Sequence, residues 1–132
     1  MRKGLSTAYS GLGYLIVLLG VVQFFLVGLG LFAGETFEAH EGLGWGIHSL
    51  TILVLLLSIL GPRTKQDIIL GVALFVVTTI QTSLPGLRDD AGWLAAFHPV
   101  LALAVLGIAA HIGRRYIGGA AGGGSGEPAT AV

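Results

Sequence analysis

The residues best suited to chemistry in this chain are histidines that recur together with glutamines at one fixed offset. A shift of 58 positions carries Gln23 onto Gln81 and His40 onto His98. The chain has only three Gln and four His, so these matches are more informative than the leucine and glycine matches at the same offset. Self-similarity at a fixed offset indicates a duplicated structural unit. We therefore expect two repeats that each end in a histidine, and a pair of imidazoles can bind one transition metal.

The composition indicates the surroundings of these residues. Hydrophobic residues make up 54% of the 132-residue chain and charged residues only 11%. This is about half the charged fraction of a soluble domain, and the mean hydropathy is +0.87. We therefore expect an all-α integral membrane protein whose main partner is the lipid bilayer. The net charge of zero argues against nucleic-acid binding. The chain has no cysteine, which excludes disulfides and thiolate ligands.

Long apolar runs separated by short polar turns predict four membrane-spanning helices, because one span needs about 20 residues. Gly61-Pro62 is a strong helix breaker between the second and third helices. Pro85-Gly86 predicts a kink near the end of the third helix. The expected helices cover residues of about 9–33, 36–60, 66–87 and 91–113, within a domain of residues 1–117. The Gly/Ala-rich tail, residues 118–132, is predicted to be disordered.

The basic residues predict the orientation in the membrane. The N-terminus, the loop at residues 63–65 and residues 114–115 together contain six of the seven Lys and Arg. In a four-span chain these three segments lie on one side, which the positive-inside rule makes cytoplasmic. We therefore expect a multi-pass protein of the cell membrane with both termini in the cytoplasm. His40 and His98 then lie toward the outside.

The repeat also predicts how the histidines are placed in the bundle. Each repeat contains two helices, so both repeats enter the membrane in the same direction. His40 and His98 then lie at equal depth on the second and fourth helices, which face each other diagonally in an up-down four-helix bundle. Two histidines in this arrangement can hold one planar metal cofactor from both faces.

Neighbouring residues have a functional and a structural interpretation. Gly44 lies on the second helix between His40 and His48, where a missing side chain leaves room for a flat ring. The same glycine-rich segment is also typical of closely packed membrane helices. Gln23 and Gln81 could accept the second ring proton of a histidine ligand, or could form interhelical hydrogen bonds alone.

These residues resemble those of known families. A family of small four-helix prokaryotic membrane proteins of unknown function is similar over about residues 9–113, on the pattern Gln23-x-x-Leu26-x-Gly28-Leu29 and then His40-Glu41-Gly42-Leu43-Gly44. A Gln-bearing helix before a His-bearing one is also similar to one half of haem A synthase, and membrane b-type cytochromes hold haem by histidine pairs. This chain is half as long as the synthase and has no cysteine-bearing outer loop. The likeness implies haem b between His40 and His98, with His48 as the alternative ligand, and not the synthase reaction.

Other interpretations of the histidines stay open. His40 and His98 could be interfacial residues that hydrogen-bond to loops or water. His48 could be a hydrogen-bonded core histidine, and His111 an interfacial residue near Arg114. Three glutamates lie near His40, but the Glu-x-x-His pattern of di-iron bundles is missing because Phe37 occupies the position three residues before it.

Two functions therefore remain at this stage. The first is a small haem b protein for electron transfer or haem handling, with a membrane redox partner or a second copy of the chain as its possible partner. The second is a non-catalytic accessory subunit or small carrier whose histidines are structural. No serine or carboxylate stands beside a histidine in a hydrolytic motif, and the sequence favours a protein that is not an enzyme.

Overall fold

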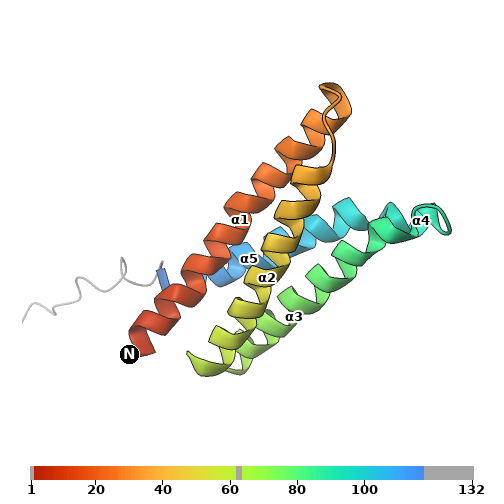
Figure 1. Cartoon of the computed structure of the whole chain (residues 1–132). Helices are drawn as coiled ribbons and strands as arrows, with labels where there is room; N and C mark the ends of the chain where they lie inside the picture. Colours follow the sequence, from red (N-terminus) through yellow and green to blue (C-terminus); the bar gives the residue numbers. More distant parts are fainter. Residues whose placement is uncertain (1, 62–63, 118–132) are drawn as a thin grey trace, which may run out of the picture.

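The structure is a computed structural model that describes residues 2–61 and 64–117. These residues form helices joined by short connections (Figure 1). The elements in chain order are α1 (Arg2–Phe32), α2 (Glu38–Leu60), α3 (Lys65–Ser83), the 3₁₀ helix η1 (Leu84–Leu87), α4 (Gly92–Ala95) and α5 (His98–Ile117). Arg63 and the tail at residues 118–132, which was expected to be disordered, lie outside the described residues.

Local sequence accounts for where these helices begin and end. Gly34 follows α1 with φ of +73°, a conformation that glycine adopts without steric cost. Thr64 caps α3, because its side-chain oxygen accepts a hydrogen bond from the Asp67 N–H at 3.1 Å. Pro85 stands in the first turn of η1, where the expected kink takes the form of a 3₁₀ turn.

Two boundaries differ from the expected ones. The fourth span, expected as one helix from about residue 91, is divided into α4 and α5. Pro99 explains the division, because a proline inside a helix lacks the N–H and clashes with the preceding turn, but fits the first turn of a new helix. α1 begins at Arg2 instead of about residue 9, and its early part is held by contacts of Tyr9 and Ser10 with other helices.

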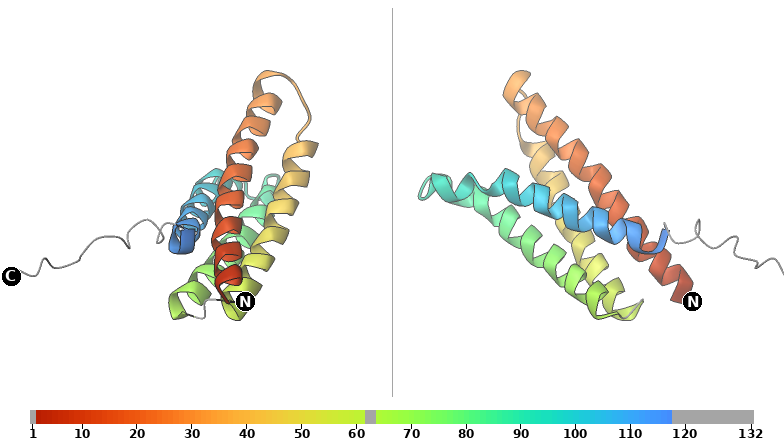
Figure 2. Two further views of the ribbon diagram at one scale, coloured as in Figure 1. Left: turned by 90° about the vertical axis from the view of Figure 1, so that its left-hand side faces the viewer. Right: turned by 180° about the vertical axis from the view of Figure 1, so that it is seen from behind.

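The prediction of an all-α fold with four membrane-spanning helices is confirmed for the described residues. The segments Lys3–Phe32, Glu38–Leu60, Lys65–Leu87 and Gly92–Tyr116 are long and apolar enough to cross a membrane. Successive membrane-spanning helices run in opposite directions, so the start of α1, the end of α2, the start of α3 and the end of α5 share one end of the bundle (Figure 2). α1 and α3 each pack against both α2 and α5, which leaves α2 and α5 across the diagonal.

The buried core repeats the 58-residue offset that the sequence shows. Residues at equivalent positions of the two repeats are buried together, even where their types differ. These buried pairs are Tyr9/Asp67, Ile16/Leu74, Ile47/Val105, Thr51/Ala109 and Val54/Ile112. The two repeats therefore share one packing scheme, and the duplication is visible in the fold as well as in the Gln and His residues.

A polar cluster closes the bundle at the end where the chain begins. The Asp67 side chain is fully buried, and it accepts hydrogen bonds from Arg115, from the Thr64 hydroxyl and from the Tyr116 hydroxyl, the last at 2.7 Å. Tyr9 donates to the Asp67 main-chain oxygen at 3.2 Å. Because these groups satisfy one another, the buried carboxylate is compensated, and the cluster ties α1, α3 and α5 together.

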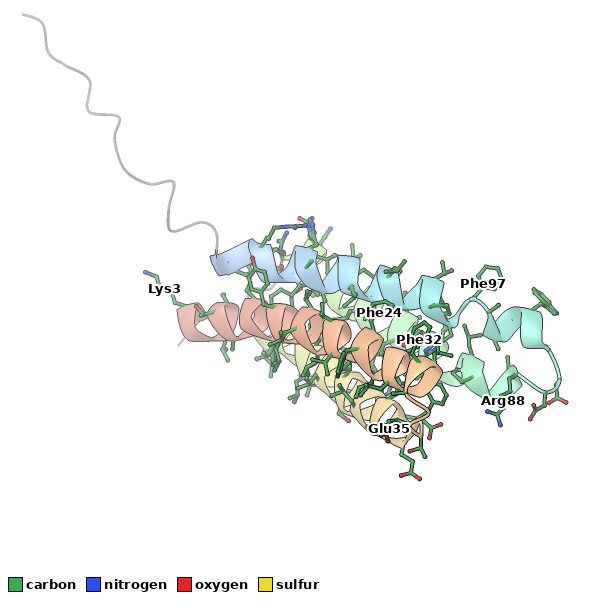
Figure 3. All side chains as sticks on the ribbon, turned by 90° about the horizontal axis from the view of Figure 1, so that it is seen from above. Lys3, Phe24, Phe32, Glu35, Arg88 and Phe97 are labelled. Atoms are coloured by element: carbon green, nitrogen blue, oxygen red, sulfur yellow. The ribbon has the colours of Figure 1, made fainter. Side chains whose placement is uncertain are left out.

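At the opposite end the two hairpins diverge. Figures 1 and 2 show the α1–α2 hairpin and the α3–α5 hairpin separating toward their connecting segments. Figure 3 places Lys3 at the joined end, whereas Glu35 and Arg88 lie at the divergent end. The space between the diverging hairpins contains the histidine pair.

Candidate functional site

The structure brings His40 and His98 together across the bundle. Their ring centroids lie 6.0 Å apart, with an angle of 66° between the ring planes. His40 is on the first turn of α2 and His98 begins α5, so each ring projects from the start of a helix in its own repeat. Both side chains are partly buried. Two elements that are diagonal in the bundle thus supply one imidazole each to a common place.

Each histidine uses one ring nitrogen to contact the preceding helix of its repeat. His40 Nδ1 lies 3.4 Å from the main-chain oxygen of Gln23, and His98 Nδ1 lies 2.8 Å from the main-chain oxygen of Gln81. A carbonyl oxygen can only accept, so this contact favours the tautomer with the proton on Nδ1. Nε2 is then the ring nitrogen that is left as an acceptor in both rings, and in His98 it lies 3.4 Å from the carboxamide nitrogen of Gln81. A backbone carbonyl on the second nitrogen is the usual environment of a metal-binding histidine.

The glutamine side chains differ between the repeats. Gln23 Nε2 donates to the main-chain oxygen of His40 at 3.0 Å. Gln81 Nε2 instead contacts the His98 ring, 3.3 Å from Nδ1 and 3.4 Å from Nε2. The carboxamide of Gln23 therefore faces the backbone, whereas that of Gln81 lies against an imidazole.

A cavity of about 480 Å³ surrounds the histidine pair. Its lining repeats the internal duplication, because residues from equivalent positions face it from both hairpins. The equivalent lining pairs are Gly20/Thr78, Gln23/Gln81, Val27/Pro85, His40/His98, Glu41/Pro99, Gly44/Ala102 and Ile47/Val105. Gly44 and Ala102 each follow a histidine by one helical turn, so both histidines have a small residue next to them inside the cavity. The residues around the two histidines are therefore equivalent in the two repeats. Other lining residues, such as Phe24 and Leu106, have no equivalent in the lining.

The two sides of the histidine pair differ in polarity. Toward α1 and α5 the cavity is lined by Phe24, Val27 and Leu106. Toward α2 and η1 a second hollow of about 460 Å³ shares both histidines and is lined by Arg88 and Asp89. A molecule between the imidazoles would therefore have one apolar edge and one polar edge.

One polar atom of the cavity is buried without a partner. Among the described residues, no donor reaches Gln23 Oε1, which is shielded from solvent. An unsatisfied buried acceptor is costly, which points to a donor from outside the chain. Gly44 leaves room for this carboxamide, because a Cβ at that position would lie only 3.2 Å from Gln23 Nε2.

The structure separates the other two histidines from this site. His48 Nε2 lies 3.0 Å from the Thr79 hydroxyl, between Trp45 and Phe75, and the described lining of the cavity does not include it. His48 is therefore partly buried between α2 and α3, outside the cavity that His40 and His98 share. His111 is exposed on the last turns of α5, near the end of the bundle that lacks the cavity.

Within residues 2–61 and 64–117, no group of three or more His, Asp or Glu is arranged to hold a metal ion.

Two residues of the site were not expected from the sequence. Ala102 could have been found as the repeat partner of Gly44, and Arg88 as the one Lys or Arg between Lys65 and Arg114.

The chain was compared with known proteins. No curated protein and no solved structure matches it. The expected remote likeness to haem A synthase and b-type cytochromes therefore has no support from the comparisons, whereas the likeness to an uncharacterised family does. One family model matches part of the chain. The matched part includes Gln23, His40 and Gln81 and ends before His98. Over residues 23–85 the chain is similar to a family of unknown function (DUF6220).

Proposed function

We propose that this chain binds haem b between His40 and His98 in a membrane-embedded bundle and serves in electron transfer or haem handling. The observation that carries the proposal is the matched histidine pair. Both imidazoles direct Nδ1 to a main-chain carbonyl oxygen of their own repeat, which leaves Nε2 as the nitrogen that could bind a metal, and the ring centroids lie 6.0 Å apart. In His98 this nitrogen now lies 3.4 Å from the Gln81 carboxamide, which a metal would displace.

The separation of the rings fits two ligands on one metal. Metal–imidazole bonds of about 2.0–2.1 Å place the two bound nitrogens about 4 Å apart and the two ring centroids about 6 Å apart. The observed centroid separation of 6.0 Å agrees with this value. This agreement supports one metal held by an imidazole from each repeat.

The cavity also fits a flat cofactor. Its volume of about 480 Å³ falls in the range of about 300–1,000 Å³ that is typical of cofactor sites. Gly44 and Ala102 leave space beside the imidazoles, and the Phe24 side supplies apolar surface. Imidazole nitrogens suit transition metals such as iron, and the two imidazoles are the groups that approach each other across this cavity.

Haem bound in this way supplies a one-electron redox centre. His40 and His98 would hold the iron from the two repeats through one ring nitrogen each. The Gln23 and Gln81 carbonyls would hold the tautomer and orientation of the two rings. Burial and these hydrogen bonds are the means by which the chain would tune the reduction potential. The arrangement favours a carrier of electrons or haem over an enzyme, with a membrane redox partner or a second copy of the chain as the partner.

The placement in the membrane is part of the proposal. Among the described residues, the basic residues at the start of α1, at the start of α3 and in the last turn of α5 lie at the end of the bundle away from the cavity: Arg2, Lys3, Lys65, Arg114 and Arg115. The positive-inside rule then gives cytoplasmic termini and a site in the outer half of the cell membrane.

The visible spectrum of the detergent-purified protein, expressed with ample haem, tests the proposal. The wild type is expected to have a sharp Soret band and, after reduction, narrow α and β bands of six-coordinate haem. His40→Ala and His98→Ala each remove one axial ligand, so their spectra should be lost or become high-spin.

Two matched substitutions control for the loss of a histidine as such. His48→Ala removes a histidine on the same helix as His40, and His111→Ala removes one on the same helix as His98. Both should keep the wild-type spectrum, because neither residue lines the described cavity. A colourless wild-type protein, or a normal spectrum in His40→Ala, would contradict the proposal.

One observation favours a second function, a carrier of a small amphipathic molecule with a hydroxyl group. Haem offers no hydrogen-bond donor at its centre, whereas Gln23 Oε1 is a buried acceptor that no described donor reaches. If the protein is colourless, extraction and mass analysis of copurified apolar alcohols distinguishes this function from a purely structural role. Under that function, Gln23→Leu should reduce the amount of the bound molecule.

A further inference from the structure

We propose that Arg88 binds the carboxylates of the porphyrin and so determines which edge of the ring faces the α2–η1 side of the cavity. This inference rests on the proposed function and adds the residue that recognises the acidic edge of the ligand. Protoporphyrin has two propionates on one edge and apolar substituents on the opposite edge, so a site that binds it must distinguish the two.

The position of Arg88 in the sequence calls for an explanation. It is the one Lys or Arg between Lys65 and Arg114, and Figure 3 shows it at the end of the bundle opposite Lys3. Its neighbourhood in the sequence is acidic, with Asp89 and Asp90 following directly. A single cation at an acidic, outward end has no role in setting the orientation of the chain.

The lining of the site gives Arg88 a position on the polar side. Arg88 lines both the central cavity and the adjoining hollow, together with His40 and His98. Phe24 and Leu106 line the opposite side. A porphyrin between the imidazoles therefore buries its apolar edge toward α1 and α5, and its propionates reach the side where the guanidinium lies. Arginine binds carboxylates through two parallel hydrogen bonds.

The present partner of Arg88 is weakly held. Arg88 Nε lies 3.6 Å from Asp89 Oδ1, and the two side chains are 79% and 87% exposed. Exposed pairs of this kind contribute little, so a propionate can replace Asp89 at small cost. Glu41 also lines the cavity and adds a negative charge that opposes an acidic ligand. Arg88 offsets this charge.

Binding of metal-free protoporphyrin IX in detergent micelles tests the inference without relying on iron ligation. Quenching of tryptophan fluorescence reports binding, since Trp45 lines the polar hollow. Arg88→Ala is expected to weaken binding of the diacid about three- to tenfold, the effect of losing one hydrogen bond of ordinary strength at an exposed position. Binding of protoporphyrin IX dimethyl ester, which lacks the charges, should be the same in wild type and Arg88→Ala.

Two further substitutions sharpen the test. Arg114→Ala removes a positive charge that is likewise exposed, but at the other end of the bundle. It should leave binding of both porphyrins unchanged. Glu41→Gln should strengthen binding of the diacid and not of the ester. If Arg88→Ala weakens both porphyrins equally, or if neither binds, the inference is overturned. If the diacid depends on Arg88 but haem gives no six-coordinate spectrum, the inference stands and axial ligation by the two histidines fails.

Discussion

Individual polar residues in this protein differ in whether the chain itself satisfies them. The carboxylate of Asp67 has donors from three side chains, whereas Gln23 Oε1 has none among the described residues. Buried polar groups are normally paired, so the first is expected to hold the fold together and the second to contact a ligand. The two lie at opposite ends of the bundle, and each can be changed without direct effect on the other.

Asp67→Asn is expected to destabilise the protein by about 2–3 kcal/mol, because it leaves the Arg115 guanidinium beside a neutral group. The Arg115 side chain is only 18% exposed and that of Asp67 is 0% exposed, so water does not replace the lost partner. Unfolding in mixed micelles by titration with dodecyl sulfate measures the change.

Asp89→Asn is the matched control for this substitution. It removes the same charge from the exposed pair with Arg88, where a change below about 0.5 kcal/mol is expected. Equal effects of the two substitutions would show that the cluster around Asp67 does not stabilise the fold.

The helices are held together by equivalent close contacts in the two repeats. A Cβ added to Gly13 would lie 2.7 Å from the Ala109 main-chain oxygen on α5. A Cβ added to its repeat partner, Gly71, would lie 2.6 Å from the Ser58 hydroxyl oxygen on α2. Both glycines thus permit a close approach between one repeat and the other, as small residues do in membrane bundles.

The obstacles differ, and the effects of substitution should differ with them. Gly13→Ala meets backbone atoms that cannot move aside, so we expect a loss of about 1–3 kcal/mol from overpacking. Gly71→Ala meets a serine hydroxyl that can rotate, and should cost less. Gly42→Ala is the control, since no described atom lies within 4 Å of its added Cβ and alanine is the better helix former by about 1 kcal/mol. The dodecyl sulfate titration gives the order, and a Gly13→Ala protein as stable as wild type would contradict this packing.

The sequence was sufficient to predict the features that the repeat controls. His40 and His98 are identical residues at equivalent positions, so their meeting across α2 and α5 follows from the duplication and the up-down order of the helices. The cluster around Asp67 could not be found in this way. Asp67 is 48 residues from Arg115 and its repeat partner is Tyr9, a residue of another type.

The distinction between the histidines also needed the structure. His48 has no repeat partner of its type, because the equivalent position is Leu106. The sequence alone did not show which helix its side chain contacts. Its contact with Thr79 on α3 places it apart from His40. The division before Pro99 was available from the sequence, since a proline at that point disfavours one continuous helix.

The molecule as a whole has opposite charges at its two ends. Lys3 lies at the end where the hairpins join, together with the start of α3 and the last turns of α5, which contain Lys65, Arg114 and Arg115. The divergent end has Glu35, Glu38, Glu41, Asp89 and Asp90, and Arg88 as a single cation. Arg115 is held in the buried cluster around Asp67, whereas the other charged residues named here are exposed, so packing does not account for this asymmetry. It is what the positive-inside rule expects of a chain inserted with its joined end in the cytoplasm.

Cysteine labelling tests this orientation, and the chain suits the method because it has no cysteine of its own. Asp90→Cys and Glu35→Cys place a thiol in the two connections at the divergent end, whereas Lys65→Cys and Arg114→Cys place one at the joined end. A membrane-impermeant maleimide added to intact cells is expected to label the first two and not the second two, and all four should be labelled after the membrane is opened. The reverse pattern would put the histidine pair on the cytoplasmic side. Haem would then be exchanged with the cytoplasm, and the outward placement of the site proposed here would be wrong.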